Sequence, residues 1–164
     1  METKNLIPGD CLLYGRTPFL KSPIGWFFGL VINIKTWSRF SHVEIYAGNK
    51  TSMASRDGVG VGFYPLRKDQ LLKVRRPSDK DFDYPKGVKF SLLSDGQKYD
   101  WLGLLCFTYA VHSGSKDKQF CSEFATRFYR KAGLEPFNPE VDADHVAPAQ
   151  FDQSPALRTV WKKP

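Results

Sequence analysis

Short segments with strand-like patterns occupy much of the first half of the chain. In His42–Ala47, apolar residues fall at the odd positions and polar or aromatic residues at the even ones, so the two sets face opposite sides of a sheet. Gly48-Asn49-Lys50 is a hairpin turn signal, and it predicts Thr51–Ser55 as the return strand. The remaining expected strands are Cys11–Tyr14, Gly60–Tyr64 and Leu71–Arg75. Together these segments predict an antiparallel meander.

Helical spacing of apolar residues marks two further segments. Ser22-Pro-Ile-Gly25 suits a helix start, because proline is tolerated in the first turn. Near the other end of the chain, Phe120, Phe124 and Phe128 recur every four residues and predict a buried helix face that ends at Gly133. The apolar positions of the first helix are Trp26, Phe27, Leu30, Val31 and Ile34, and its aromatic residues are expected in the core together with Trp37.

Two other segments complete the predicted organisation of the chain. The apolar stretch Tyr99–Ala110 predicts a helix with Asp100 as its N-cap, followed by a polar loop at His112–Lys118. Glu135–Pro164 contains five prolines and is expected to wrap the surface. Strands in the first part and helices in the second predict an α+β fold with an antiparallel sheet packed against helices.

Composition restricts this fold to one domain. The 164 residues suffice for a single core, and 41% apolar with 25% charged residues is the mix of an ordinary globular protein. The longest apolar run, Gly25–Ile34, is about half of the roughly 20 residues that a membrane span needs. The first residues show no signal-peptide pattern, so we expect a cytoplasmic location and no transmembrane segment.

The net charge of +7 lies entirely in residues 1–90, because residues 91–164 hold equal numbers of acidic and basic side chains. A basic region of this kind attracts anionic partners such as an acidic polymer or a membrane surface, although it also suits an ordinary solvated surface. No nucleic-acid-binding motif accompanies it. The basic residues are densest at Arg67, Lys68, Lys73, Arg75 and Arg76.

The cysteines argue against a metal site or a disulfide framework. Cys11, Cys106 and Cys121 are odd in number and form no CxxC pair, which favours a reducing compartment. No glycine-rich phosphate loop or paired metal-ligand spacing occurs elsewhere, so we expect no cofactor and no metal. One of the three thiols can then be chemically active.

Cys121 is the best candidate for that thiol, because it stands at the front edge of the last predicted helix. Free backbone N–H groups and the helix dipole at this position favour an anion, which makes a thiol a better nucleophile. The same N–H groups can hold a developing oxyanion. The alternative is a small apolar residue packed beside Phe120 and Phe124.

A thiol nucleophile needs a base, and His42 is the histidine best placed to act as one. It lies on the polar face of an otherwise apolar strand, whereas His112 falls in a predicted loop and His145 in the proline-containing tail. The alternative for His42 is a solvent-facing residue on a one-sided sheet. Neither interpretation is favoured by spacing alone.

Three residues are candidates for the group that orients the imidazole. Glu44 lies two residues along the same strand face, so its carboxylate can reach His42. A Gly48-Asn49 turn would instead bring Ser55 opposite His42, and an Asn49-Lys50 turn would bring Asp57 there. We prefer Glu44 as the orienting group.

Tyr14 and Tyr46 are candidates for binding the substrate, although buried tyrosines are more often part of a core.

Two of these segments resemble motifs of a known family. Ser41-His-Val-Glu-Ile-Tyr-Ala-Gly48 resembles the histidine strand of NlpC-type and lecithin:retinol acyltransferase-like proteins, and Phe120-Cys-Ser-Glu-Phe-Ala-Thr-Arg-Phe-Tyr-Arg-Lys-Ala-Gly133 resembles their cysteine helix. The histidine precedes the cysteine here, as in the circularly permuted YiiX/YebB-like branch. Shorter likenesses to that branch are Ile7-Pro-Gly-Asp10, Tyr99-Asp-Trp-Leu-Gly103 and Ala147-Pro-Ala-Gln-Phe-Asp-Gln-Ser-Pro155.

The resemblance implies a permuted papain-like α+β domain over residues 1–164, with Cys121 as nucleophile and His42 as base. It further implies a cysteine peptidase or amidase acting on a peptide or acyl substrate, with peptidoglycan-type peptides as one candidate. The chain departs from the family pattern at Glu44, where glycine is usual. Many non-permuted relatives also carry a second polar residue about a dozen positions after the histidine, where this chain has Ala54 and Ser55, neither of which is a strong histidine-orienting group. The alternatives are a lipid acyltransferase or lipase of the same fold, and a non-catalytic basic binding module.

Overall fold

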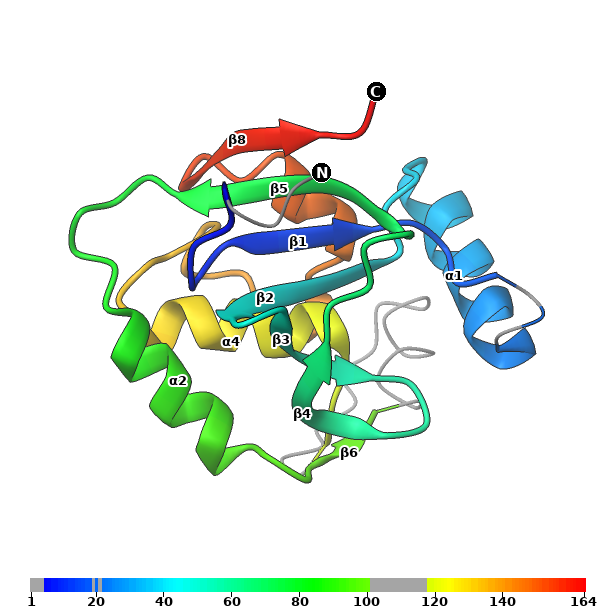
Figure 1. The fold of residues 1–164 in the computed structure, drawn as a ribbon, viewed down its shortest axis with the longest axis horizontal. Helices are drawn as coiled ribbons and strands as arrows, with labels where there is room; N and C mark the ends of the chain where they lie inside the picture. The colour runs from blue at the N-terminus through cyan, green and yellow to red at the C-terminus, as the bar shows by residue number, and fades with distance from the viewer. Residues whose placement is uncertain (1–4, 19, 21, 101–117) are drawn as a thin grey trace.

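The computed structural model describes residues 5–18, 20, 22–100 and 118–164. Within them the protein is α+β, with a six-stranded antiparallel sheet, a short two-stranded sheet and three α-helices (Figure 1). The expected helix at Tyr99–Ala110 and the loop at His112–Lys118 fall almost entirely outside this part of the chain, as do Cys106 and His112.

The large sheet is built around β1 (Cys11–Tyr14), whose four residues are fully buried. A strand buried in this way needs a hydrogen-bonding neighbour on both sides. One neighbour is β2 (His42–Gly48) and the other is β5 (Leu71–Pro77), which the chain reaches by crossing past β1. The meander is therefore confirmed for β2, β3 (Thr51–Arg56) and β4 (Gly60–Pro65) but wrong for β5. The strand order is β4-β3-β2-β1-β5-β8.

The hairpin between β2 and β3 has a register that turn chemistry alone does not predict. Asn49 and Lys50 both have positive φ, as a tight two-residue turn requires, and Gly48 pairs with Thr51. An irregularity between Tyr46 and Gly48 then shifts the pairing, so that Ile45 lies opposite Met53. Continued to the end of the strand, this register places Arg56 opposite His42. Both predicted partners of His42, Ser55 and Asp57, are therefore wrong.

Helix α4 (Cys121–Lys131) confirms the predicted helix near the end of the chain. Phe124, Ala125 and Phe128 are fully buried in the core cluster that Val43 and Ile45 of β2 also join. The helix stops just before Gly133, which has the positive φ of a typical helix end.

Helix α2 (Tyr84–Leu93) was not predicted, since its sequence YPKGVKFSLL has only weak apolar periodicity. It packs against α4 (Figure 1), and Gly87 allows the close approach.

Helix α1 (Pro23–Thr36) begins where the sequence predicts, because the Ser22 hydroxyl accepts a hydrogen bond from the N–H of Gly25 at 3.0 Å. Its burial differs from the prediction. Gly29 and Ile32 are its buried residues, whereas Phe27 is 55% exposed and Trp37, just beyond the helix, is 95% exposed. Placing these aromatic residues in the core was therefore wrong. No helix within the described ranges has the length and apolar character that crossing a bilayer requires.

The tail after Glu135 is part of the core and the sheet, so the prediction that it wraps the surface is wrong. Phe151 is fully buried against Tyr129, in a short 3-10 helix at Pro148–Asp152. Strand β8 (Leu157–Lys162) then pairs with β5 at the sheet edge. The buried Arg75 guanidinium of β5 stabilises the turn between the 3-10 helix and β8 by donating hydrogen bonds to the carbonyls of Asp152, Ser154 and Leu157.

The contact between α2 and α4 yields a test of the packing. A Cβ atom at position 87 would lie 2.6 Å from the buried Phe128 ring. We expect Gly87→Ala to lower the free energy of unfolding by about 1–3 kcal/mol, although alanine normally stabilises a helix interior. Lys89→Ala, at an exposed site of the same helix, should change it by less than about 0.5 kcal/mol. Urea unfolding measures both, and a stabilised Gly87→Ala protein would contradict the packing.

Candidate active site

The sheet and α4 bring His42 and Cys121 together from distant parts of the chain. His42 is the first residue of β2 and pairs with Tyr14, while Cys121 is the first residue of α4. The Cys121 side chain is close enough to the His42 imidazole to raise its pKa by charge and hydrogen bonding. The second ring nitrogen of His42, Nε2, lies 3.0 Å from Oε1 of Glu44. Since Glu44 occupies Nε2, Nδ1 is the nitrogen left for the thiol.

Two opposing effects set the charge state of His42. Burial by itself would lower the pKa of the imidazole, as would the neighbouring Arg67. The negative charge of the Cys121 sulfur and the hydrogen bonds to Cys121 and Glu44 act in the other direction and outweigh burial, so the pKa of His42 is raised. The site therefore favours the protonated imidazole more than water does, with Cys121 and Glu44 as the groups that stabilise it.

Glu44 is fully buried, and the His42 side chain beside it is only 15% exposed, so the alternative of a solvent-facing His42 is wrong. Glu44 Oε1 accepts hydrogen bonds from Arg56 Nε at 2.9 Å and Arg67 Nη2 at 2.8 Å. Its Oε2 accepts from Ser52 Oγ at 2.5 Å and Arg56 Nη2 at 3.1 Å. Burial alone would raise the pKa of Glu44, but His42 and the two guanidinium groups hold it well below its usual range. The Glu44 carboxylate is therefore ionised in the folded protein near neutral pH.

Arg56 and Arg67 belong to the site, although the sequence did not single out either one as a site residue. Arg56 reaches Glu44 from the end of β3, where the register of the irregular hairpin, continued beyond Ile45 and Met53, places it opposite His42. Arg67 comes from the loop after β4, and its guanidinium lies over the Tyr14 ring at 5.1 Å. A correct register for the hairpin would have identified Arg56. The sequence identified Arg67 only as one of the densely spaced basic residues between positions 67 and 76.

The two rival orienting residues have other roles. Ser55 donates its hydroxyl to the backbone carbonyl of Gln119 at 2.5 Å, two residues before Cys121, and so attaches the start of α4 to β3. Asp57 accepts a hydrogen bond from the Ser22 hydroxyl at 3.2 Å, at the beginning of α1. A negative charge there also interacts favourably with the helix dipole.

The first turn of α4 begins at the thiol-bearing residue, Cys121. Its N-cap residue is Phe120, whose side chain has no oxygen and cannot accept from the first-turn N–H groups. The Phe120 N–H itself donates to Glu123 Oε2 at 3.3 Å. Burial raises the pKa of Glu123 to about 7, with Arg127 opposing the shift. The first turn therefore presents backbone N–H groups beside Cys121, as an oxyanion site requires.

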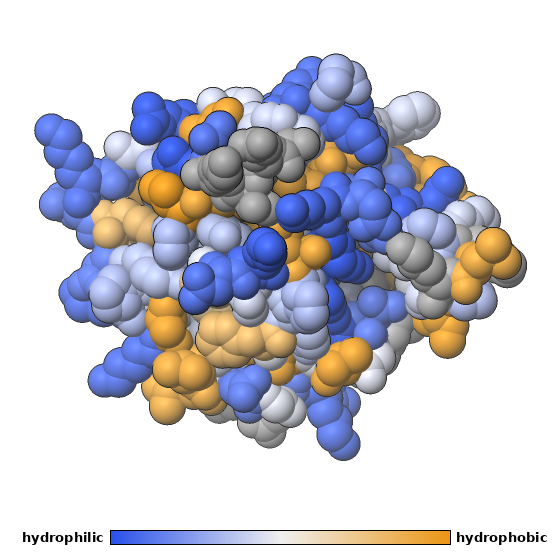
Figure 2. Space-filling view, in the orientation of Figure 1, coloured by the Kyte–Doolittle hydropathy of each residue, from blue (hydrophilic) through white to orange (hydrophobic). Residues whose placement is uncertain are grey.

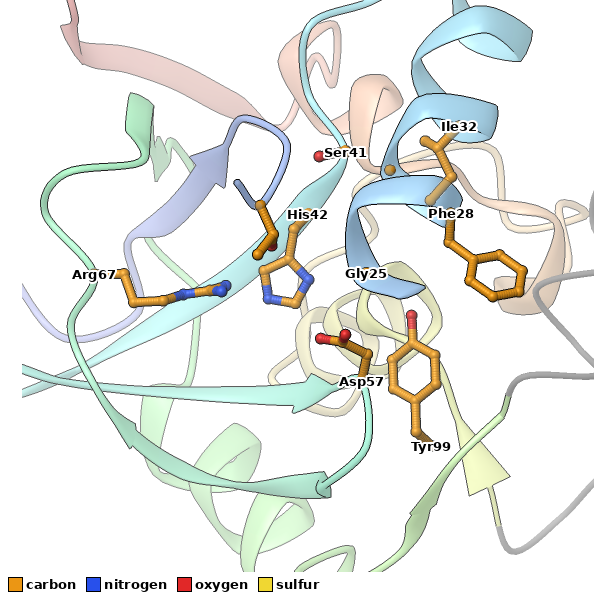
Figure 3. A pocket seen from close by; sticks show the side chains of 10 residues that line it. Gly25, Phe28, Ile32, Ser41, His42, Asp57, Arg67 and Tyr99 are labelled. Carbon is orange, nitrogen blue, oxygen red and sulfur yellow. The ribbon is translucent and has the colours of Figure 1, made fainter. Parts of the chain in front are cut away.

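A pocket opens beside His42, between α1 and the hairpin (Figure 3). Gly25, Phe28 and Ile32 of α1 form one side, and Asp57, Arg67 and Tyr99 lie around the imidazole. Burial raises the pKa of Tyr99, and the nearby negative charges of Cys121 and Asp57 raise it further. Tyr99 is therefore a neutral hydroxyl at the site that the sequence did not identify.

Neither tyrosine that we expected to bind substrate is among the described residues that line this pocket. The Tyr14 ring lies 6.0 Å from the His42 ring and supports it from the neighbouring strand. Tyr46 is buried in the apolar cluster with Leu12, and its hydroxyl accepts from the Lys50 N–H at 3.4 Å.

No protein-family model and no curated protein sequence matches this chain.

The burial of Glu44 generates a prediction about stability. Glu44→Gln removes the charge that neutralises Arg56 and Arg67, and we expect the free energy of unfolding at pH 7 to fall by about 2–4 kcal/mol. Glu44 has a lowered pKa in the folded state, so its contribution is present above its ordinary value of 4.5. This stabilising contribution is lost as the pH falls towards the lowered pKa of Glu44 in the folded protein. Urea unfolding at pH 7, 5 and 3 measures the difference.

Glu135→Gln is the matched control, because Glu135 pairs with Arg130 through two hydrogen bonds but is about one-third exposed. It should lower stability by less than about 1 kcal/mol. Equal effects of the two substitutions would show that the Glu44 network is not a buried charge cluster.

Proposed function

We propose that this protein is a thiol hydrolase with a permuted papain-like fold, which cleaves an amide bond through Cys121, His42 and Glu44. The observation that carries the proposal is the bridging position of one imidazole. His42 interacts with the Cys121 side chain, and its Nε2 lies 3.0 Å from a buried carboxylate oxygen. A nucleophile, its base and an orienting group in this order form the arrangement that covalent acyl transfer needs.

The reaction begins when Nδ1 of His42 takes the thiol proton and the Cys121 sulfur attacks the substrate carbonyl. Backbone N–H groups in the first turn of α4 stabilise the oxyanion. As the C–N bond breaks, the His42 imidazolium gives its proton to the leaving amine, and a thioester remains on Cys121. His42 then removes a proton from a water molecule, whose oxygen attacks the thioester. The carboxylic acid leaves, and the thiol is regenerated.

Glu44 acts on this reaction through His42. An ionised carboxylate at Nε2 requires that nitrogen to carry a proton, which leaves the Nδ1 lone pair free to act as the base. Arg56 and Arg67 supply charge-assisted hydrogen bonds to the same carboxylate. They keep Glu44 from accepting the imidazole proton, so it orients the ring instead of acting as a base.

The pocket supports an amide substrate with polar groups near the scissile bond. Arg67, Asp57 and Tyr99 surround the imidazole, while Phe28 and Ile32 provide an apolar side. Peptidoglycan-type peptides are the substrate class that the motif resemblance implies. Cys11 and Cys121 are both free thiols, which supports action in a reducing compartment such as the cytoplasm.

An activated acyl ester, p-nitrophenyl acetate, tests the nucleophile without knowledge of the substrate. We expect the ester to acetylate Cys121, as located by peptide mass spectrometry, and to be hydrolysed catalytically. Cys121→Ala should abolish the adduct, and His42→Gln should slow hydrolysis by about 10²–10⁴-fold, because the base is lost. Retention of both labelling and hydrolysis in the Cys121→Ala protein would rule out the mechanism.

Cys11→Ala is the control, since Cys11 is fully buried under Tyr129 and burial raises the pKa of its thiol strongly. This variant should keep wild-type labelling and turnover. A panel of peptide amides and acyl-ester lipids then separates amide hydrolysis from lipid chemistry on the same dyad. A protein that is acetylated on no cysteine and hydrolyses nothing would instead be the non-catalytic binding module.

A further inference from the structure

The outward side of α1 is apolar, which is unusual for a helix at a protein surface. At 100° per residue, Ile24, Phe27 and Ile34 fall on one side of the helix, and they are 62%, 55% and 63% exposed. The opposite side carries the buried Gly29 and Ile32, which also line the pocket of His42. A surface helix normally places polar residues outward, so this arrangement needs a partner for the exposed side.

The apolar surface continues beyond both ends of the helix. Leu20, before the first turn, is 96% exposed, and Trp37, after the last turn, is 95% exposed. Trp37 adopts a left-handed conformation at the C-cap, where its backbone N–H bonds to the carbonyls of Asn33 and Ile34. In the view of Figure 2, apolar side chains are visible at the edge of the molecule where Figure 1 shows α1.

The charge of the segment that contains α1 favours an anionic lipid membrane as the partner. Residues 15–41 contain no acidic residue and four basic ones: Arg16, Lys21, Lys35 and Arg39. Aromatic and aliphatic side chains flanked by lysine and arginine are typical of helices that lie in the headgroup region of a bilayer. A second copy of this chain is a poor partner, because a symmetric contact would bring two basic segments together.

We propose that α1 and its flanking residues Leu20 and Trp37 bind to the surface of an anionic membrane, with the helix axis in the membrane plane. The 14 residues of α1 extend for about 21 Å, which is less than the roughly 30 Å of a bilayer core. The helix therefore lies on the membrane. Its inner side lines the pocket of His42, so binding brings the candidate active site to the membrane surface.

Co-sedimentation with vesicles tests the proposal on the whole 164-residue chain. We expect binding to vesicles of 70% phosphatidylcholine and 30% phosphatidylglycerol, and at least about tenfold weaker binding to pure phosphatidylcholine, because the basic residues need anionic headgroups. Phe27→Ser combined with Ile34→Ser should weaken binding to the anionic vesicles at least about tenfold, because it removes two exposed apolar side chains.

Leu92→Ser combined with Leu93→Ser is the matched control, since these residues are 60% and 76% exposed at the end of α2. The control should bind like the wild type, and unchanged circular dichroism and thermal midpoints show that both variants fold. No binding of the wild type to anionic vesicles, or equal losses in the two double variants, would overturn the proposal. So would a wild-type dimer, seen by light scattering, that the α1 variant loses, because it would identify a second copy as the partner.

Membrane binding does not depend on the chemistry at Cys121. We expect Cys121→Ala to bind anionic vesicles with wild-type affinity, even where it is not acetylated. A protein that binds vesicles but shows no acyl transfer would therefore overturn the proposed function alone. One that is acetylated on Cys121 but binds no vesicles would overturn the membrane proposal alone.

Discussion

The Glu44 carboxylate, shielded from solvent and shared by an imidazole and two guanidinium groups, is the interaction on which the candidate site depends. A charge removed from water in this way is tolerated only when oppositely charged donors surround it. Those donors come from β2 itself, from β3 and from the loop after β4. The same electrostatic requirement therefore fixes the relative positions of three segments and the orientation of the His42 ring.

The charged partners that burial of Glu44 requires also keep its carboxylate ionised, and this determines how His42 is oriented. Because the carboxylate stays ionised, it can hold one nitrogen of His42 while the other faces Cys121. The sulfur in turn lies at the first residue of a helix whose N-cap side chain accepts no hydrogen bond from the first turn. The orientation of the base and the environment of the thiol thus arise from separate parts of the fold, which meet because α4 packs against β2.

Local patterns predicted the elements that carry the site, but not the contacts between them. Alternation identified β2, helical spacing identified α4, and Ser22-Pro23 marked the start of α1. The position of Arg56 depends on a one-residue irregularity near Gly48, which composition does not reveal. The outward apolar side of α1 escaped prediction for a different reason. Sequence periodicity shows which residues share a side of a helix, but it does not show which side the rest of the protein covers.

Long-range contacts account for the other differences. The tail contains several prolines, which suggested an exposed segment, yet Phe151 completes the core and β8 extends the sheet. The Arg75 side chain, which donates to three tail carbonyls, belongs to a strand more than 70 residues earlier in the chain. No pattern local to either segment carries information about that pairing.

The most direct test of the account is the pKa of His42, measured by nuclear magnetic resonance in the wild type and in the Cys121→Ala protein. The resonance is assigned by its loss in His42→Gln. If the imidazole bridges the thiol and the carboxylate, its pKa lies above the ordinary value of 6.5 in the wild type and falls when the sulfur is removed. A pKa that is the same in both proteins would show that the two side chains do not interact, and the proposed dyad would not exist.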